Sequence, residues 1–218
     1  EEWLSYAPKE TLSYFMYQNP RRAKKLFHDI IPKSSDEFLG HLNKFNTQSD
    51  QEQIENPVWH IMNGENSIGN VNVTYNLILN LVAASGKNDP AIILDFVKKY
   101  DENINSSNRQ FINDLIKGAI NFERDITSEQ INYKTPSSEE RKIFEDLINR
   151  LRSQAESADA ETIQTEIYQI GKDHNFENLR DWFKLIYQVL FGKEDGPRFG
   201  TFIAIYGIKQ TIELIEEK

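Results

Sequence analysis

Apolar residues recur at spacings of three and four along almost the whole chain, which is the period of an amphipathic α-helix. No long stretch alternates apolar and polar residues as a half-buried strand would. The clearest helical run is residues 179–191, where one face carries Leu179, Trp182, Phe183, Ile186, Val189 and Leu190. We therefore predict an all-α protein.

The same period predicts further helices at residues 9–18, 20–31, 34–44, 71–85, 91–100, 111–126, 139–152, 160–172, 201–206 and 208–217. Pro20 suits the first position of its helix. Ser34 before Glu37, and Ser137 before Glu140, have the spacing of helix-starting caps. The polar residues 46–53 predict a loop. Residues 56–61 are short and apolar, and a strand or an extended segment is left open there.

A short loop bounded by glycines follows the helix at 179–191. Gly192 ends that helix, and after three charged residues comes the run Gly196-Pro197-Arg198-Phe199-Gly200. Glycine permits backbone angles that other residues avoid, and proline fixes its own φ. We expect this loop to hold Arg198 at a helix start. The plainer alternative is a hairpin whose loop only turns the chain.

The chain has 218 residues, no cysteine and a formal net charge of −9. This length suffices for one large or two small cores, and the lack of cysteine excludes disulfides and thiolate metal sites. No apolar run approaches the roughly 20 residues of a membrane span. The first residues are neither a signal peptide nor an initiator methionine, so we expect a piece of a longer protein.

The negative net charge argues against a general nucleic-acid binder, because affinity for phosphates comes from clustered lysine and arginine. The first 44 residues are nevertheless slightly basic, and four cations stand close together: Arg21, Arg22, Lys24 and Lys25. In a helix Arg21 and Lys25 would share a face. This cluster is interpreted either as a solvated face or as a patch that grips phosphates.

No catalytic motif of useful specificity occurs in the sequence. A glycine-rich phosphate loop, an HExxH helix and a serine elbow are all missing. His60 has no second histidine or carboxylate cluster near it, so we interpret it as a structural histidine. We expect no catalytic and no metal site in this chain, which the residues alone describe as a binding or interaction module.

Several segments resemble the carboxy-terminal part of class I lysyl-tRNA synthetases, over the whole length of the chain. The similar segments are Glu2-Trp3-Leu4-Ser5-Tyr6-Ala7-Pro8, Pro20-Arg21, Asp36-Glu37-Phe38-Leu39, Asn56-Pro57-Val58-Trp59-His60-Ile61, Asp89-Pro90, Arg180-Asp181-Trp182-Phe183 and Gly196-Pro197-Arg198-Phe199-Gly200. The resemblance implies that residues 1–68 form a mostly helical, stem-contact-like connecting region. Residues 69–218 would then form a helical anticodon-binding cage, with a subdivision near 134–138 left open.

Under this resemblance, the anticodon would be bound by Arg198, Phe199, Arg180, Trp182 and Lys193, and the tRNA backbone by Arg21, Arg22, Lys24 and Lys25. Unpaired bases are read by stacking on aromatic rings or arginine planes and by hydrogen bonds along their edges. For Trp182 and Phe199 packing in the core is an equal alternative, since both fit the apolar stripe.

The resemblance implies a lysine–tRNA ligase whose full-length form attaches lysine to tRNA(Lys) with ATP and magnesium in the cytoplasm. Its catalytic domain, with both ATP-binding signatures, would precede this chain, so we expect no cofactor here. No DNA or membrane partner is expected. A glutamyl-tRNA synthetase is one alternative, and a non-catalytic helical scaffold for proteins is another.

Overall fold

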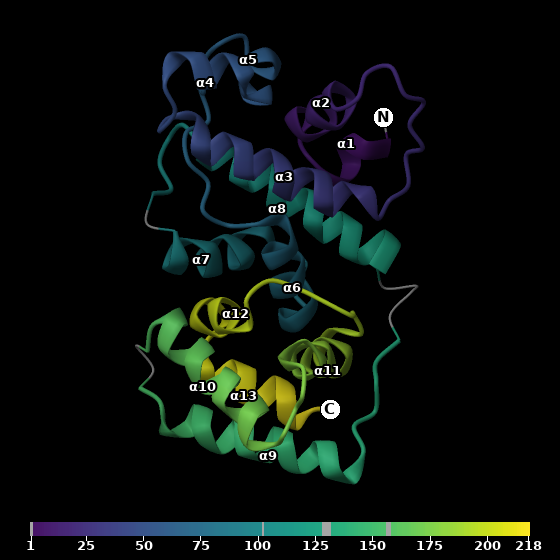
Figure 1. The fold of residues 1–218 in the computed structure, drawn as a ribbon, viewed down its shortest axis with the longest axis vertical. Coiled ribbons are helices and arrows are strands. Elements are labelled where there is room, and N and C mark those ends of the chain that lie inside the picture. The colour runs from purple at the N-terminus through teal and green to yellow at the C-terminus, as the bar shows by residue number, and fades with distance from the viewer. Residues whose placement is uncertain (1, 102, 128–131, 156–157) are drawn as a thin grey trace. The chain divides into compact units, whose positions relative to one another are not determined.

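The computed structural model describes residues 2–101, 103–127, 132–155 and 158–218. Every regular element in these ranges is a helix, which confirms the all-α prediction (Figure 1). The trace divides into unit 1, Glu1–Val82 with Lys87–Ser128, and unit 2, Ala83–Gly86 with Glu129–Lys218. The subdivision predicted near 134–138 stays a prediction. The division at residue 68, as one between functional regions, stays a prediction.

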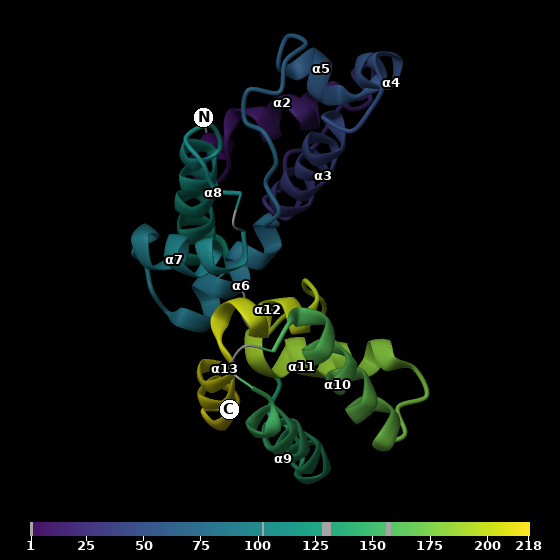
Figure 2. The ribbon, with the colours of Figure 1, turned by 90° about the vertical axis from the view of Figure 1, so that its left-hand side faces the viewer.

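Unit 1 is built from short and medium helices. They are α1 Glu2–Tyr6, α2 Lys9–Tyr17, α3 Ile30–Phe45, α4 Asp50–Glu55, α5 Pro57–Ile61, α6 Tyr75–Ser85, whose last turn belongs to unit 2, α7 Pro90–Tyr100, α8 Arg109–Phe122 and the π-helical turn η1 Glu123–Thr127. Helix α1 packs against α8, and α2 packs against α3. The short helices α4 and α5 lie together at one end of α3 (Figure 2).

In the core of unit 1, helices α6 and α8 both contact the carbonyl group of Tyr6 at the end of α1. A methyl group added at Gly118 of α8 would lie 2.1 Å from this carbonyl oxygen, so only glycine allows the two helices to approach so closely. The same oxygen accepts a hydrogen bond from the buried Tyr75 hydroxyl at 2.5 Å. These contacts hold α1 against α8 and against the start of α6.

Helix α6 begins at Tyr75 and not near residue 71, where the apolar pattern predicts it. Val71 and Val73 are buried, but they lie in an extended segment ahead of the helix. Asp36 of α3 caps the new start, accepting from the backbone nitrogen of Tyr75 at 2.5 Å and from Nδ2 of Asn76 at 2.7 Å. Burial raises the pKa of this carboxyl group above its usual range.

The predicted helix over residues 20–31 is wrong. Asn19 has a positive φ of 47°, its carbonyl closes a turn with the amide of Arg22 at 3.0 Å, and residues 23–27 have no regular structure. Leu26 and Phe27 are 60% and 58% exposed, so no apolar face is buried here. A helical repeat forms a helix only where a neighbouring element covers its apolar stripe.

Helix α3 starts earlier than predicted, at Ile30, and Ser34 is not its cap. Ser34 and Ser35 are buried inside the helix, where the Ser35 hydroxyl donates to the carbonyl of Ile31 at 2.8 Å. Pro32 lies in the first turn, where the missing N–H has no intrahelical partner to lose. A proline and a serine pair thus look like a boundary in the sequence although the helix runs through them.

Two further short segments differ from the prediction. Within the polar stretch 46–53, Ser49 and Glu52 form a capping box that opens α4. Residues 57–61 form helix α5, because the side chain of the preceding Asn56 accepts from the amide of Val58 at 3.0 Å and Pro57 takes the first position. The predicted single helix over 111–126 ends at Phe122 and continues as η1.

Unit 2 follows the predicted pattern closely. Its helices are α9 Ser138–Ser153, α10 Ala160–Asp173, α11 Leu179–Phe191, α12 Phe199–Tyr206 and α13 Ile208–Glu216. The capping box of Ser137 and Glu140 is confirmed, and Gly192 ends α11 as predicted, with a left-handed conformation at φ 64°. Helix α10 packs against α9, α11 and α12, and α13 packs against α9 and α12.

Candidate nucleic-acid interface

The loop between α11 and α12 is fastened to the Tyr187 side chain from two directions. The Tyr187 hydroxyl donates a hydrogen bond to the carbonyl oxygen of Pro197. Gly196 lies against the same ring, and a methyl group added there would be 2.1 Å from its Cε1 atom. Tyr187 is itself 2% exposed, so the loop is tied to the core of the unit and not only to solvent-facing groups.

The residues after Arg198 hold the loop from the other side. Phe199 is fully buried, stacked on Phe202 with ring centroids 5.7 Å apart. The backbone nitrogen of Gly200 donates to Oε1 of Gln164 in α10 at 2.7 Å. A methyl group at Gly200 would lie 2.5 Å from the carbonyl oxygen of Ala160, so this glycine is required by the close contact of α12 with α10.

Arg198 is the exposed residue of this fastened loop. Its side chain is 54% exposed, and Nη2 lies 2.9 Å from Oε2 of Glu161 in the first turn of α10. The Glu161 side chain is 74% exposed, so both charges remain in contact with water. An ion pair of this kind contributes little stability, about 0–1 kcal/mol, and is easily rearranged by a ligand. The predicted placement of an accessible arginine at a helix start is confirmed.

Trp182 and Phe199 are placed in the core and not on a surface that RNA could reach. Trp182 is fully buried, its Nε1 donates to the carbonyl of Ile167 at 3.0 Å, and a methyl group at Gly171 would lie 2.8 Å from its Cδ1 atom. A base can stack on either ring only if the helices separate. The packing alternative therefore accounts for both rings, which belong to the apolar stripe of the bundle.

The remaining predicted anticodon residues do not gather in one place. Arg180 is exposed at the start of α11, beside the carboxyl end of α10, where Leu179 contacts Gly171. Arg198 lies beside the amino end of α10, where it contacts Glu161. With a rise of about 1.5 Å per residue, the ends of α10 are roughly 15–20 Å apart. Lys193 shares the loop of Arg198, and its amide donates to the carbonyl of Tyr187 at 3.2 Å.

Several carboxylates border the loop. Glu194 pairs with Lys184 at 2.9 Å, and Asp195 contributes with burial to raising the pKa of the Tyr187 hydroxyl. Asp159 caps α10 by accepting from the amides of Glu161 and Thr162, and these hydrogen bonds lower the pKa of its carboxyl group. The surroundings of Arg198 are therefore mixed in charge, in contrast to the uniformly basic groove of a general phosphate binder.

The predicted basic patch is divided between exposed and folded-in side chains. Arg21, Arg22 and Lys25 are exposed on the irregular loop and form no ion pair with any residue in the described ranges. Lys24 instead folds back, donating from Nζ to the carbonyl of Phe15 and lying 4.6 Å from the centroid of its ring. Burial lowers the pKa of Lys24. Because the helix is absent, Arg21 and Lys25 share no helical face.

Three residues that position Arg198 were not predicted: Glu161, Gln164 and Tyr187. Glu161 stands one residue after the predicted start of its helix, a position that indicates a helix cap but does not reveal which side chain it pairs with. Gln164 and Tyr187 are polar residues within apolar stripes. Gln164 and Gly200 are 36 residues apart, so no local pattern predicts the hydrogen bond between them. Only the docking of α12 on α10 brings them together.

His60 is a structural residue, as predicted. Its Nε2 lies 2.8 Å from the carbonyl oxygen of Ile54, and its ring stacks on Tyr17 with centroids 5.3 Å apart. Among the described residues no group of three or more histidine, aspartate or glutamate side chains could hold a metal ion. In the same part of the chain, no helix combines the length and apolarity needed to cross a membrane.

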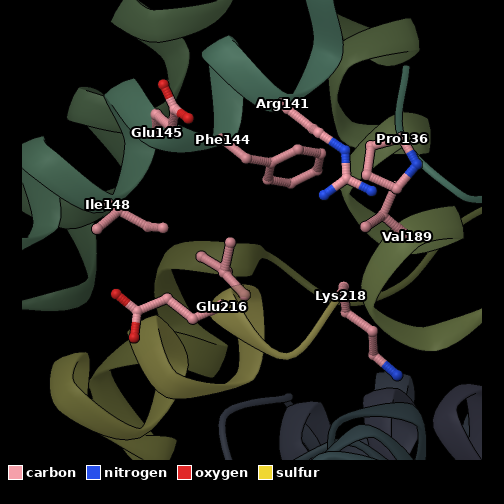
Figure 3. Close-up of a pocket in the computed structure, with 9 residues that line it drawn as sticks. Pro136, Arg141, Phe144, Glu145, Ile148, Val189, Glu216 and Lys218 are labelled. Carbon is pink, nitrogen blue, oxygen red and sulfur yellow. The ribbon is translucent and has the colours of Figure 1, made fainter. Parts of the chain in front are cut away.

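A small cavity lies within unit 2 between α9, the end of α11 and the end of α13. Its volume is ≈ 140 Å³, with Phe144, Ile148 and Val189 on its apolar side and Arg141 and Lys218 around its rim (Figure 3). Sites for small molecules usually measure roughly 300–1,000 Å³. This cavity is too small for a nucleotide and adds nothing to the Arg198 loop.

Comparison with known proteins gives matches over the whole chain. Residues 1–65 match the model of the family described as tRNA synthetases class I (K). The chain is 40% identical over 220 aligned positions to lysine–tRNA ligases of Rickettsia bellii and Rickettsia felis, covering 100% of this chain and 42% of each relative. The lysine–tRNA ligase of Rickettsia peacockii is 38% identical over 218 positions, covering 99% and 42%.

The predicted resemblance is thereby confirmed, and the alternative of a glutamyl-tRNA synthetase has no support in these matches. The chain spans 42% of the length of the curated relatives that it matches. Over its whole length the chain is similar to part of the lysine–tRNA ligases, and its first 65 residues match the class I family model.

Proposed function

We propose that this chain is the tRNA-binding portion of a lysine–tRNA ligase, with unit 2 receiving the anticodon. The observation that carries the proposal is the alignment of the entire chain, at 40% identity, with proteins named lysine–tRNA ligase. The fold supports it, because the described residues offer helical surfaces and a fastened loop with an exposed arginine, and no catalytic constellation. The full-length protein would join lysine to tRNA(Lys) in the cytoplasm.

That reaction would use ATP and magnesium, which activate the amino acid when bound. The described residues do not fit this group: they contain no glycine-rich phosphate loop and no cluster of carboxylates able to hold magnesium. No step involving ATP is therefore derived from this chain. Its contribution to the reaction is to bind and orient the tRNA, which lowers the entropy cost of bringing the acceptor end to the reacting groups.

Within unit 2 we assign anticodon contacts to Arg198 and Lys193, which share one loop, and a separate contact to Arg180 at the other end of α10. Guanidinium planes can stack on unpaired bases and donate hydrogen bonds to their edges. In unit 1 the exposed Arg21, Arg22 and Lys25 are assigned to the tRNA backbone. Lys24 would first have to leave the Phe15 ring.

Binding of the chain to two tRNA(Lys) transcripts, one with its own anticodon and one with a substituted anticodon, tests this proposal. We expect tighter binding of the unchanged transcript, by about tenfold for each lost base contact. Tighter binding of tRNA(Glu) would instead assign the chain to the glutamyl enzymes. Equal affinity for both tRNA(Lys) transcripts would reject anticodon recognition and favour a helical scaffold.

A further inference from the structure

The Arg198 loop presents a hydrogen-bond donor and a hydrogen-bond acceptor side by side. The guanidinium can only donate, and the Glu161 carboxylate can only accept. Their facing atoms are 2.9 Å apart, and each side chain is more than half exposed. A ligand that reaches Arg198 therefore meets a carboxylate at the same time.

The fold anchors the backbone that carries both groups. Asp159 fixes the first turn of α10 through its hydrogen bonds to the amides of Glu161 and Thr162, at 2.9 and 2.8 Å. Gln164, one turn further along α10, holds the amide of Gly200 at 2.7 Å. The backbone on either side of the ion pair is thus anchored, and only the two exposed side chains are able to rearrange.

A phosphodiester group does not match this arrangement. Its oxygens accept hydrogen bonds and carry negative charge, so Glu161 would have no donor to accept from and would repel the ligand. Asp159 and Asp195 add further negative charge near the loop. A phosphate contact to Arg198 would require the Glu161 carboxylate to move away.

The edge of a nucleobase does match it. Every base carries at least one N–H donor next to a carbonyl or ring-nitrogen acceptor, so an edge can donate to a carboxylate and accept from a guanidinium together. Unpaired bases expose these edges, and RNA loops are recognised in this way.

We infer that Glu161 and Arg198 together bind the edge of one unpaired base of the anticodon loop, and that Glu161 is a specificity-determining residue which excludes a phosphate from this position. The inference rests on the proposed function, because it names the chemical group that the same site would bind. It goes beyond that proposal in assigning a role to an acidic residue and in choosing the base over the backbone.

Glu161→Ala separates the two kinds of contact by the sign of its effect. If a base edge is bound, the variant loses one of two hydrogen-bonded groups, and its affinity for a tRNA(Lys) anticodon stem-loop falls by about tenfold. The slope of log affinity against log salt stays unchanged, since no phosphate contact is altered. If Arg198 contacts a phosphate, the same substitution removes a repulsive charge, so the affinity rises.

Four companion variants complete the experiment. Glu161→Gln keeps the carbonyl acceptor and the side-chain shape, so we expect it to retain more affinity than Glu161→Ala. Arg198→Ala is measured alone and together with Glu161→Ala, and the double variant should weaken binding by less than the product of the single effects, because the two groups bind one edge. Glu177→Ala, an exposed carboxylate beyond the other end of α10, controls for the change in net charge.

Rising affinity in Glu161→Ala, or an affinity equal to that of Glu177→Ala, would overturn the inference while leaving anticodon binding intact. Failure of the proposed function has a different signature. In that case the unaltered chain would bind stem-loops with the unchanged and the substituted anticodon equally well. Circular dichroism of each variant shows whether the helices are retained.

Discussion

The hydroxyl group of Tyr75 donates a hydrogen bond to the carbonyl oxygen of Tyr6 at 2.5 Å, joining the start of α6 to the end of α1. Tyr75 is fully buried, so its hydroxyl has no water to replace this partner. Burial also raises the pKa of Tyr75 well above its usual value, which favours the protonated hydroxyl that donates this hydrogen bond. The ring of Phe122 lies edge-on to both tyrosine rings, with centroids 5.8 Å from that of Tyr6 and 6.4 Å from that of Tyr75.

We expect Tyr75→Phe to lower the free energy of unfolding of unit 1 by about 1–2 kcal/mol, because a buried acceptor loses its partner. Tyr168→Phe is the matched control, since Tyr168 is 40% exposed and should change stability by less than about 0.5 kcal/mol. Chemical denaturation followed by the fluorescence of Trp3 and Trp59, compared with that of Trp182 in unit 2, measures both. Equal stabilities of the two variants would show that the hydrogen bond contributes nothing.

Gly118→Ala should destabilise unit 1 by about 1–3 kcal/mol, because the new methyl group would overlap the Tyr6 carbonyl oxygen. Helix propensity alone predicts the opposite, a gain of up to about 1 kcal/mol. Gly40→Ala in α3 provides the comparison, since a methyl group there meets nothing within 4 Å. We expect Gly40→Ala to raise the thermal midpoint and Gly118→Ala to lower it. A rise in both would mean that α1 and α8 separate readily.

Tyr187→Phe should loosen the loop that carries Arg198 while leaving the ring in the core. The lost hydrogen bond to Pro197 is expected to cost about 1 kcal/mol of stability and to weaken binding of the anticodon stem-loop by a few-fold. Tyr206→Phe removes a different hydroxyl of unit 2, which donates to Ala84 at 3.0 Å, and should affect stability but not RNA binding. Identical RNA affinities for both variants would indicate that the loop needs no fastening.

Unit 2 is expected to lose stability as the pH falls below about 4–5. Hydrogen bonds lower the pKa values of Asp159 and Asp173, and those from Lys134 and Ser137 outweigh the effect of burial to lower that of Glu140. A carboxyl group with a lowered pKa in the folded state contributes stability that is present above its unfolded pKa and is lost as the pH falls through the folded one. Trp182 fluorescence during acid titration follows this loss.

Asp159→Asn tests the contribution of the α10 cap to that dependence. Asparagine is also a good helix cap, so the helix start is kept, while the proton-linked part of the contribution disappears. We expect the free energy of unfolding of the variant to depend less on pH in the acid range than that of the unaltered chain. A titration curve that coincides with that of the unaltered chain would show that Asp159 is not linked to stability.

Arg21→Ala with Lys25→Ala should weaken tRNA binding without changing the preference for the anticodon. Each lost phosphate contact reduces the slope of log affinity against log salt by about 0.7–0.9. Both side chains are exposed, so we expect the substitutions to leave the fold unchanged. Measured slopes that stay the same would remove these residues from the backbone contact, and a changed anticodon preference would place them elsewhere on the tRNA.

Local sequence patterns determined most of unit 2. The apolar stripe of 179–191, the capping box of Ser137 and Glu140 and the left-handed Gly192 all have causes within a few residues, so they are visible before any tertiary contact is known. The exposed arginine at a helix start was also predictable, because the glycines and the proline around it leave few other conformations.

The sequence by itself therefore determined that the chain is helical, where the helices of unit 2 begin and end, and which family it resembles. Tertiary packing alone decided that Trp182 and Phe199 are buried, that Leu26 and Phe27 form no helix, and that Glu161 faces Arg198. The reason is physical: a helical period tells which residues share a stripe, but not whether a partner covers it. Burial and pairing depend on contacts between segments far apart in the chain, and no local pattern records these.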